Sequence, residues 1–259
     1  PLTTLAAALL LAACAHQPAT PPAPPKVEPT TAQLEHARRT GLDATQIAYL
    51  MNKPLYQMQP VEVGRYLAWQ QLDQPDLRKR IAAIARKNIG QPYELFLLGE
   101  FPYETYDTQP LFSLAKSDCV VFAEHTYAMA LSASWEEFFW VLQRIRYRDG
   151  VIGTATRNHY TEADWNVANN WLVTDVTRTL GAPTQPYHQR IDRQAFLLKQ
   201  FKIQRDVPVQ PFDDVYVAKQ DVAGYEAYAE QLSVMFKGNR KLLEDVLEGL
   251  FHIAKADDV

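Results

Sequence analysis

The chain has 259 residues, with 26 Lys and Arg against 30 Asp and Glu and a formal net charge of −4. Because acidic and basic residues are mixed along the chain, no basic patch suited to phosphate binding is expected, which excludes nucleic acid as a partner. The sequence has neither a Gly-rich phosphate loop nor a Cys/His cluster with zinc spacing, so we expect no metal and no organic cofactor.

The first thirteen residues form an apolar run that is too short to span a bilayer and is typical of a secretory signal peptide. No Met or basic residue precedes the run, so we expect the start of the signal to be missing. The run ends in Leu11-Ala12-Ala13-Cys14, which resembles the cleavage box of bacterial lipoproteins. That resemblance implies lipidation of Cys14, and Ala15 after it implies an outer-membrane lipoprotein facing the periplasm. The alternative is an ordinary cleaved signal with an incidental cysteine.

A Pro-rich segment follows, and with Cys14 we assign residues 14–30 as a lipidated tether. Residues 31–259 are then long enough for one domain with a sizeable core. The sequence contains two cysteines, so lipidation of Cys14 would leave Cys119 without a disulfide partner. Cys119 is therefore expected to be either a buried core residue or a nucleophile.

Periodicity and capping signals predict a helix-rich first half and a mixed second half. Helices are expected at 31–40, 44–51 and 60–71, from Asp73 to about Gly90, from Cys119, from the Ser134 capping box, at 161–169, and at 222–235 and 239–254. Strands are expected at 151–156 and 171–177, with a turn at 148–150 and a loop at 181–186.

Cys119 stands at the start of one of these predicted helices, directly after the potential N-cap residues Ser117 and Asp118. The positive end of a helix dipole and unpaired backbone N–H groups favour the thiolate, which is the nucleophilic form of cysteine. Taken alone, a cysteine packing as a small core residue would be the better interpretation.

A cysteine nucleophile normally needs a histidine base within hydrogen-bonding reach. His125 is on the same helix, about 240° round from Cys119, and is excluded because it faces elsewhere. His159 follows a predicted strand in a polar and aromatic stretch with Asn158 and Trp165, which is typical of a functional site. A histidine that merely caps a loop is an equally good interpretation.

Five blocks in order resemble the DUF1460 family of NlpC/P60-like, papain-type cysteine amidases of the bacterial envelope. They are Ile89-Gly90-Gln91-Pro92-Tyr93, the block from Asp118 to Glu124, the block from Arg144 to Gly150, Arg157-Asn158-His159-Tyr160, and Asp164-Trp165. The resemblance covers residues 79–177 well and the tail poorly. It implies an α+β, papain-like fold whose cysteine helix packs on a sheet.

The implied activity is cleavage of an amide in peptidoglycan or muropeptides, with N-acetylmuramoyl-L-alanine amidase activity foremost, by a monomer. Cys119 matches the nucleophile, His159 is the candidate base or a substrate-side group, and Tyr93, Asp118, Asn158 and Trp165 are candidate substrate-binding residues. The alternative is a non-catalytic envelope lipoprotein that binds cell-wall material.

Two features depart from the family pattern. Val121 stands where Thr or Ser is expected, and no His followed by Val-Gly occurs, although the family's catalytic histidine belongs to such a strand. We therefore expect a chain truncated before that strand; the alternative is a complete chain that uses His159 or has lost catalysis.

Overall fold

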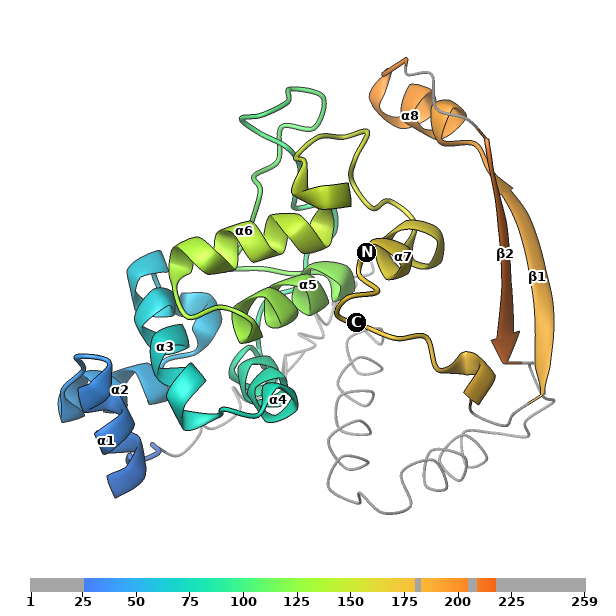
Figure 1. The fold of residues 1–259 in the computed structure, drawn as a ribbon. Helices are drawn as coiled ribbons and strands as arrows, with labels where there is room; N and C mark the ends of the chain where they lie inside the picture. Colours follow the sequence, from blue (N-terminus) through green and yellow to red (C-terminus); the bar gives the residue numbers. More distant parts are fainter. Residues whose placement is uncertain (1–25, 180–182, 205–208, 218–259) are drawn as a thin grey trace, which may run out of the picture.

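A computed structural model describes residues 26–179, 183–204 and 209–217. The predicted signal peptide, Cys14, most of the tether and the helices at 222–235 and 239–254 lie outside the described residues. The described part has a helical body and a two-stranded sheet set to one side of it (Figure 1).

The first half forms the helices that the sequence predicts. They are α1 (Thr31–Arg39), α2 (Ala44–Asn52), α3 (Pro60–Asp73) and α4 (Leu77–Lys87); the 3-10 turn η1 (Leu55–Gln57), which the sequence did not predict, lies between α2 and α3. Capping side chains define three of the starts, because Thr30, Asp43 and Asp76 each accept a hydrogen bond from a backbone N–H in the first turn. Gly90 has a φ of +89°, a conformation suited to glycine, just beyond α4.

Helices α5 (Cys119–Ala130) and α6 (Trp135–Arg146) pack against each other and against the earlier helices. Leu142, Phe138 and Met129 are completely or almost completely buried where these elements meet. At the start of α6 the Ser134 hydroxyl accepts from the Glu137 N–H at 3.1 Å, as the capping box predicts. The Glu137 carboxylate accepts a hydrogen bond from the backbone N–H of Ala133 rather than from that of Ser134.

The two predicted strands in the middle of the chain are wrong. Residues 151–156 form turns, because the N–H groups of Thr156 and Arg157 bond locally to the carbonyl of Gly153. In the segment 171–177, the backbone N–H groups of Leu172 and Val173 donate to the carbonyl of Asn169, and no strand forms. Their β-branched residues favoured strands, but their backbone groups are satisfied by local turns.

The remaining elements are short. They are the 3-10 turn η2 (Arg148–Gly150), the π-helix η3 (Thr161–Trp165), α7 (Asn166–Ala168), η4 (Thr177–Thr179), β1 (Thr184–Ile191), α8 (Arg193–Phe201) and β2 (Gln210–Val217). The predicted turn at 148–150 and helix at 161–169 are confirmed, whereas the predicted loop at 181–186 overlaps the start of β1.

Strands β1 and β2 are antiparallel, with Thr184 opposite Val217 and Ile191 opposite Gln210. The fold is thus helix-rich with a small sheet, consistent with the predicted α+β class. The prediction that the cysteine helix packs on a sheet is not met in the described residues. There α5 packs on α3, α4 and α6, and the β1–β2 sheet lies away from it (Figure 1).

Candidate active site

Cys119 is the first residue of α5, and its side chain is exposed. Asp118 is the N-cap, and its Oδ1 atom accepts from the Val121 N–H at 2.8 Å. The thiol therefore projects from a capped helix N-terminus, where the helix dipole favours a negative charge. Its exposure removes the alternative of a cysteine that packs as a small core residue.

Tyr93 lies beside this helix start because its segment runs parallel to the residues before Cys119. Tyr93 and Ser117 form a backbone bridge, in which the Ser117 N–H donates to the carbonyl of Pro92 at 3.1 Å and the Glu94 N–H to that of Ser117 at 3.1 Å. The Ser117 hydroxyl donates to Oε1 of Gln91 at 2.8 Å. Two sequence blocks that are about 25 residues apart are thus joined directly next to the thiol.

A buried ion pair lies on the inner side of α5. Oε2 of Glu124 is 3.0 Å from Nη1 of Arg146, and the indole N–H of Trp165 donates to Oε1 of Glu124 at 3.0 Å. Arg146 also donates to the carbonyl of Leu98. Burial raises the pKa of the Glu124 carboxyl, and the Arg146 guanidinium opposes that shift. The side chain of Trp165, a candidate substrate-binding residue, is thus half-buried in this network.

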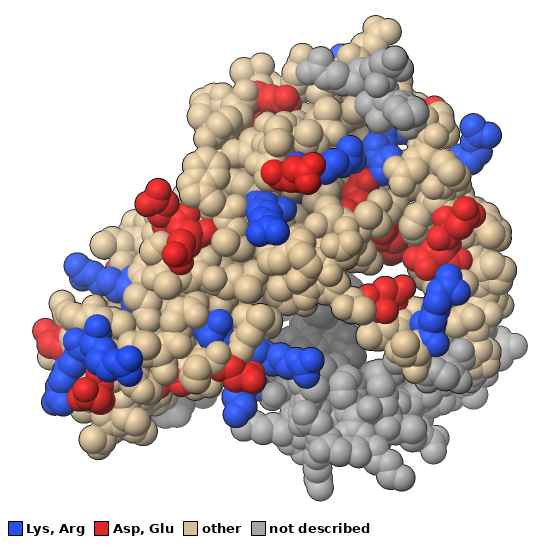
Figure 2. Space-filling view, in the orientation of Figure 1, with Lys and Arg blue, Asp and Glu red and all other residues tan. Residues whose placement is uncertain are grey.

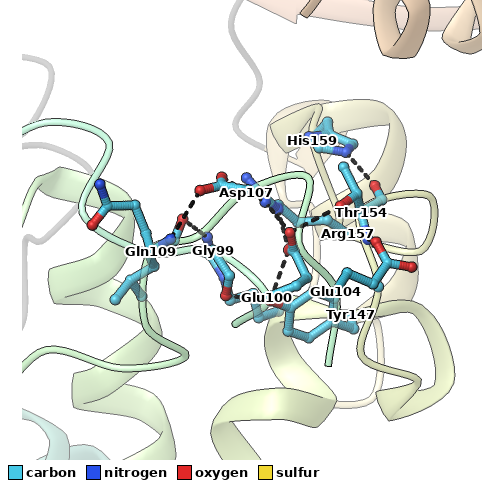
Figure 3. Close-up of polar contacts among 12 residues, drawn as sticks. Gly99, Glu100, Glu104, Asp107, Gln109, Tyr147, Thr154, Arg157 and His159 are labelled. Atoms are coloured by element: carbon cyan, nitrogen blue, oxygen red, sulfur yellow. Dashed lines mark hydrogen bonds and ion pairs between the residues drawn. The ribbon is translucent and has the colours of Figure 1, made fainter. Parts of the chain in front are cut away.

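A second buried network surrounds Glu100, which has no exposed surface (Figure 3). Its carboxylate accepts from the hydroxyls of Tyr147 at 2.9 Å and Thr154 at 3.0 Å, and from Nε of Arg157 at 2.6 Å. Arg157 also pairs with Asp107 at 2.9 Å. The network ties the loop of residues 99–109 to the Arg157-Asn158-His159 block.

His159 is held at the edge of this second network. Its Nε2 atom is 2.7 Å from the carbonyl oxygen of Thr154, so Nε2 carries the proton, and the lone pair of Nδ1 has no hydrogen-bond partner among the described residues. The ring packs against Phe196 and Phe201 of α8, with centroid distances of 4.9 and 5.8 Å. Burial lowers the pKa of His159 to about 4. Within the described residues, these contacts do not include Cys119.

Asn158, the other candidate in this block, fastens the chain to α6. Its side-chain amide donates to the carbonyl of Ile145 at 3.0 Å, and its backbone N–H donates to that of Arg146 at 3.0 Å. Its Oδ1 atom is buried and has no hydrogen-bond partner among the described residues. The contacts of Asn158 thus define a structural position.

The other described histidines have contacts of their own. His125 is buried; its Nδ1 donates to the carbonyl of Val121 at 2.9 Å, and burial lowers its pKa to about 3. His188 is exposed on β1 and pairs with Asp213 at 2.6 Å. Among the described residues, no group of three or more His, Cys, Asp and Glu is arranged to hold a metal ion.

Sequence reasoning missed the roles of Glu100, Arg146 and Glu124. One signal was present for two of them: Glu100 and Glu124 lie in or next to a run of apolar residues, where a charge is costly unless it is paired, whereas Arg146 stands among other arginines. Their partners lie 22 to 57 positions away in the sequence, so the pairing itself could not be predicted.

A comparison with protein families covers the five sequence blocks between Ile89 and Trp165. The family described as AmiA-like, N-acetylmuramoyl-L-alanine amidase-like, matches residues 83–234. The chain belongs to this family. The matched segment of the AmiA-like chain includes Tyr93, Cys119 and His159, together with both buried networks.

Solved structures are also similar to this AmiA-like chain. A Legionella pneumophila protein of the DUF1460 family is 21% identical with a TM-score of 0.53, and the match covers 61% of this chain and 62% of that protein. The fold is shared over that part. An N-acetylmuramoyl-L-alanine amidase from Bacteroides uniformis is 28% identical with a TM-score of 0.40, covering 49% of this chain and 53% of that protein. No curated protein matched the sequence.

Proposed function

We propose that this chain is a cysteine amidase of the papain-like NlpC/P60 type that cleaves the amide between N-acetylmuramic acid and L-alanine in muropeptides. The observation that carries the proposal is the exposed Cys119 thiol at the capped N-terminus of α5, in a member of an amidase-like family. A single exposed thiol in that position has the environment of a nucleophile.

In the proposed reaction, the Cys119 thiolate attacks the carbonyl carbon of the lactyl amide and forms a C–S bond. The C–N bond then breaks, and the amine of L-alanine leaves after taking up a proton. Water hydrolyses the resulting thioester, which regenerates the thiol and releases the muramoyl carboxylate. Tyr93, beside the thiol, and Asp118, which caps the helix, are the residues nearest to this chemistry.

His159 is the proposed base, or else a group that contacts the substrate. With the proton on Nε2, Nδ1 is the atom that would accept a proton, and the lowered pKa keeps the ring neutral at physiological pH while making it a weak base. None of the described contacts of the His159 imidazole reaches the Cys119 thiol. The assignment of His159 as the base therefore has less support than the assignment of Cys119 as the nucleophile. Asn158 and Trp165 are proposed as substrate-binding residues that are held in place by their hydrogen bonds to the Ile145 carbonyl and to the Glu124 carboxylate.

We further propose that the protein is a monomeric outer-membrane lipoprotein that faces the periplasm, with lipid on Cys14 and a Pro-rich tether. Peptidoglycan fragments are then its partners. No described helix has the length and apolar character needed to cross a membrane. Metabolic labelling with an alkyne palmitate, comparing wild type with Cys14→Ser, tests the anchor: equal labelling of both would refute it.

The amidase proposal is tested by incubating the protein with a purified disaccharide tetrapeptide and following the free tetrapeptide by mass spectrometry. Wild type should release it, whereas Cys119→Ala and Cys119→Ser should be at least about 10³-fold slower. Because Cys119 is exposed, both variants should keep the wild-type Tm. Identical product from wild type and variants would exclude this thiol, and no product from any of them would favour a non-catalytic binding protein.

A further inference from the structure

Thr154 links two glutamates to the imidazole of His159 (Figure 3). The carbonyl oxygen of Thr154 accepts from Nε2 of His159 at 2.7 Å. The Thr154 hydroxyl donates to Oε2 of Glu100 at 3.0 Å, and its backbone N–H donates to Oε2 of Glu104 at 2.8 Å. Thr154 is fully buried, and all three of its polar groups are thus engaged.

Both glutamates belong to one loop, residues 99–109, which we call the acidic loop. Backbone hydrogen bonds close it on itself: the Glu104 N–H donates to the carbonyl of Glu100 at 3.0 Å, and the Glu100 N–H donates to that of Asp107 at 3.2 Å. At Gly99 there is no room for a side chain, because a Cβ atom there would collide with Asp107. The acidic loop is therefore a compact support for its carboxylates.

The Glu100 carboxylate differs from the other charges of the protein. Acidic and basic side chains are mixed over the visible surface (Figure 2), whereas Glu100 is fully buried and accepts from Arg157 and from the Tyr147 hydroxyl. An ionised carboxylate can only accept, so the Thr154 hydroxyl must donate to it. Thr154 cannot turn its carbonyl away from His159 without losing such charge-assisted hydrogen bonds.

This arrangement determines the state of the His159 ring. A neutral imidazole has two tautomers, in each of which one nitrogen donates and the other accepts. Because a carbonyl can only accept, Thr154 selects the tautomer with the proton on Nε2. The rings of Phe196 and Phe201, at centroid distances of 4.9 and 5.8 Å, restrict rotation of the imidazole.

We propose that Glu100 and Glu104 are positioning residues, which hold His159 in its Nε2–H tautomer through Thr154. Neither carboxylate needs to touch the imidazole, because the Thr154 carbonyl lies between them and the ring. The catalytic consequence of this inference rests on the proposed function, in which Nδ1 of His159 accepts a proton.

The first test follows the Nε2 proton of His159 by NMR in the full chain labelled with ¹⁵N-histidine. A proton held by a buried carbonyl exchanges slowly with water, and His159→Gln identifies its signal. Glu104→Ala and Thr154→Val each remove one support of Thr154, and we expect the exchange to become at least about tenfold faster. Thr154→Ser keeps the hydroxyl and should exchange as wild type does.

His125 is the internal control for folding. Its Nδ1 proton is held by the carbonyl of Val121 at 2.9 Å and should exchange at the same rate in every variant. Thr105→Val, at an exposed position of the acidic loop, is the matched control for Thr154→Val and should leave His159 unchanged. Faster exchange at both histidines would mean that the loop supports the whole fold, and it would overturn the proposal. Unchanged exchange at His159 would also overturn it.

The second test is the release of tetrapeptide. A misplaced base slows the chemical step, so kcat should fall at least about tenfold for Glu104→Ala and Thr154→Val, with KM changed less than about twofold. Thr154→Ser should keep the wild-type kcat. A higher KM at unchanged kcat would assign the acidic loop to substrate binding and overturn the positioning role.

These outcomes are distinct from failure of the amidase proposal. If wild type releases no tetrapeptide, that proposal is refuted, whereas faster exchange confined to His159 in the variants would still support the positioning of its ring. Conversely, Cys119-dependent release of tetrapeptide with the same His159 exchange in all variants would refute the positioning role alone.

Discussion

Oε2 of Glu124 lies 3.0 Å from Nη1 of Arg146, and both side chains are buried. This pair connects the helix that carries Cys119 to the end of α6, and Trp165 joins it from η3. Three of the sequence blocks that resemble an amidase family are thus united by one network of charges. In the described structure, the hydrogen bonds of Arg146 and Trp165 to Glu124 fix the position of α5.

The first prediction concerns this pair. Glu124→Gln leaves the Arg146 charge buried without compensation, and we expect it to lower the free energy of unfolding by about 3–5 kcal/mol. Adding Arg146→Met should recover part of that loss, because the unpaired charge is removed. Urea denaturation measures both.

Glu35→Gln is the matched control for the first prediction. Glu35 pairs with Arg38 on the surface of α1, where an ion pair contributes little, so no measurable change is expected. If the losses of Glu124→Gln and Arg146→Met simply add in the double variant, the two charges are not coupled.

The second prediction concerns the N-cap of α5. Asp118→Ala removes the acceptor for the Val121 N–H and should cost about 1 kcal/mol, whereas Asp118→Asn keeps an acceptor and should cost only a few tenths. Asp118→Asn also removes a negative charge next to Cys119, and the loss of that charge favours the thiolate. Iodoacetamide should therefore alkylate the folded Asn variant faster than wild type, and a slower reaction would contradict this account.

The third prediction tests His159 as the base. His159→Gln can still donate to the carbonyl of Thr154 but cannot accept a proton, so tetrapeptide release should fall about 10²–10⁴-fold. His188→Gln, at an exposed site on β1, should have no effect. An unchanged kcat for His159→Gln, in a protein whose activity requires Cys119, would show that another group is the base.

The fourth prediction concerns the effect of pH on stability through His125. Its Nδ1 donates to Val121 and its Nε2 accepts from the Ser113 N–H at 3.3 Å, so the folded protein holds the neutral ring. Its pKa is about 3 in the folded state, against an ordinary value of 6.5. Between these values only the unfolded state takes up the proton, so stability is complete above pH 6.5 and declines as the pH falls.

At pH 5 the loss that His125 contributes should be about 2 kcal/mol relative to pH 7. His125→Gln should flatten the fall in the free energy of unfolding by that amount, even though the variant is less stable at pH 7. Urea denaturation at several pH values measures this slope. The exposed His188→Gln should leave the slope as in wild type, and an equal slope for His125→Gln would contradict the prediction.

The sequence by itself determined the helical half of the fold, including the place of Cys119 at the start of a helix. Local signals sufficed there, because caps such as Asp43 and Asp118 and apolar spacing along α4 act within one or two turns. The cysteine count left Cys119 as either a core residue or a nucleophile, and the ordered blocks indicated the amidase resemblance that the family match supports.

Only the tertiary structure decided what the other candidate residues touch. Trp165 and Asn158 had the composition of a binding site, yet their polar atoms bond to Glu124 and to the carbonyl of Ile145. Likewise, the strand-like residues 151–156 form turns beside the buried Glu100 network. Pairing of charges across 22 to 57 positions is a long-range property, and it is set by packing rather than by local preference.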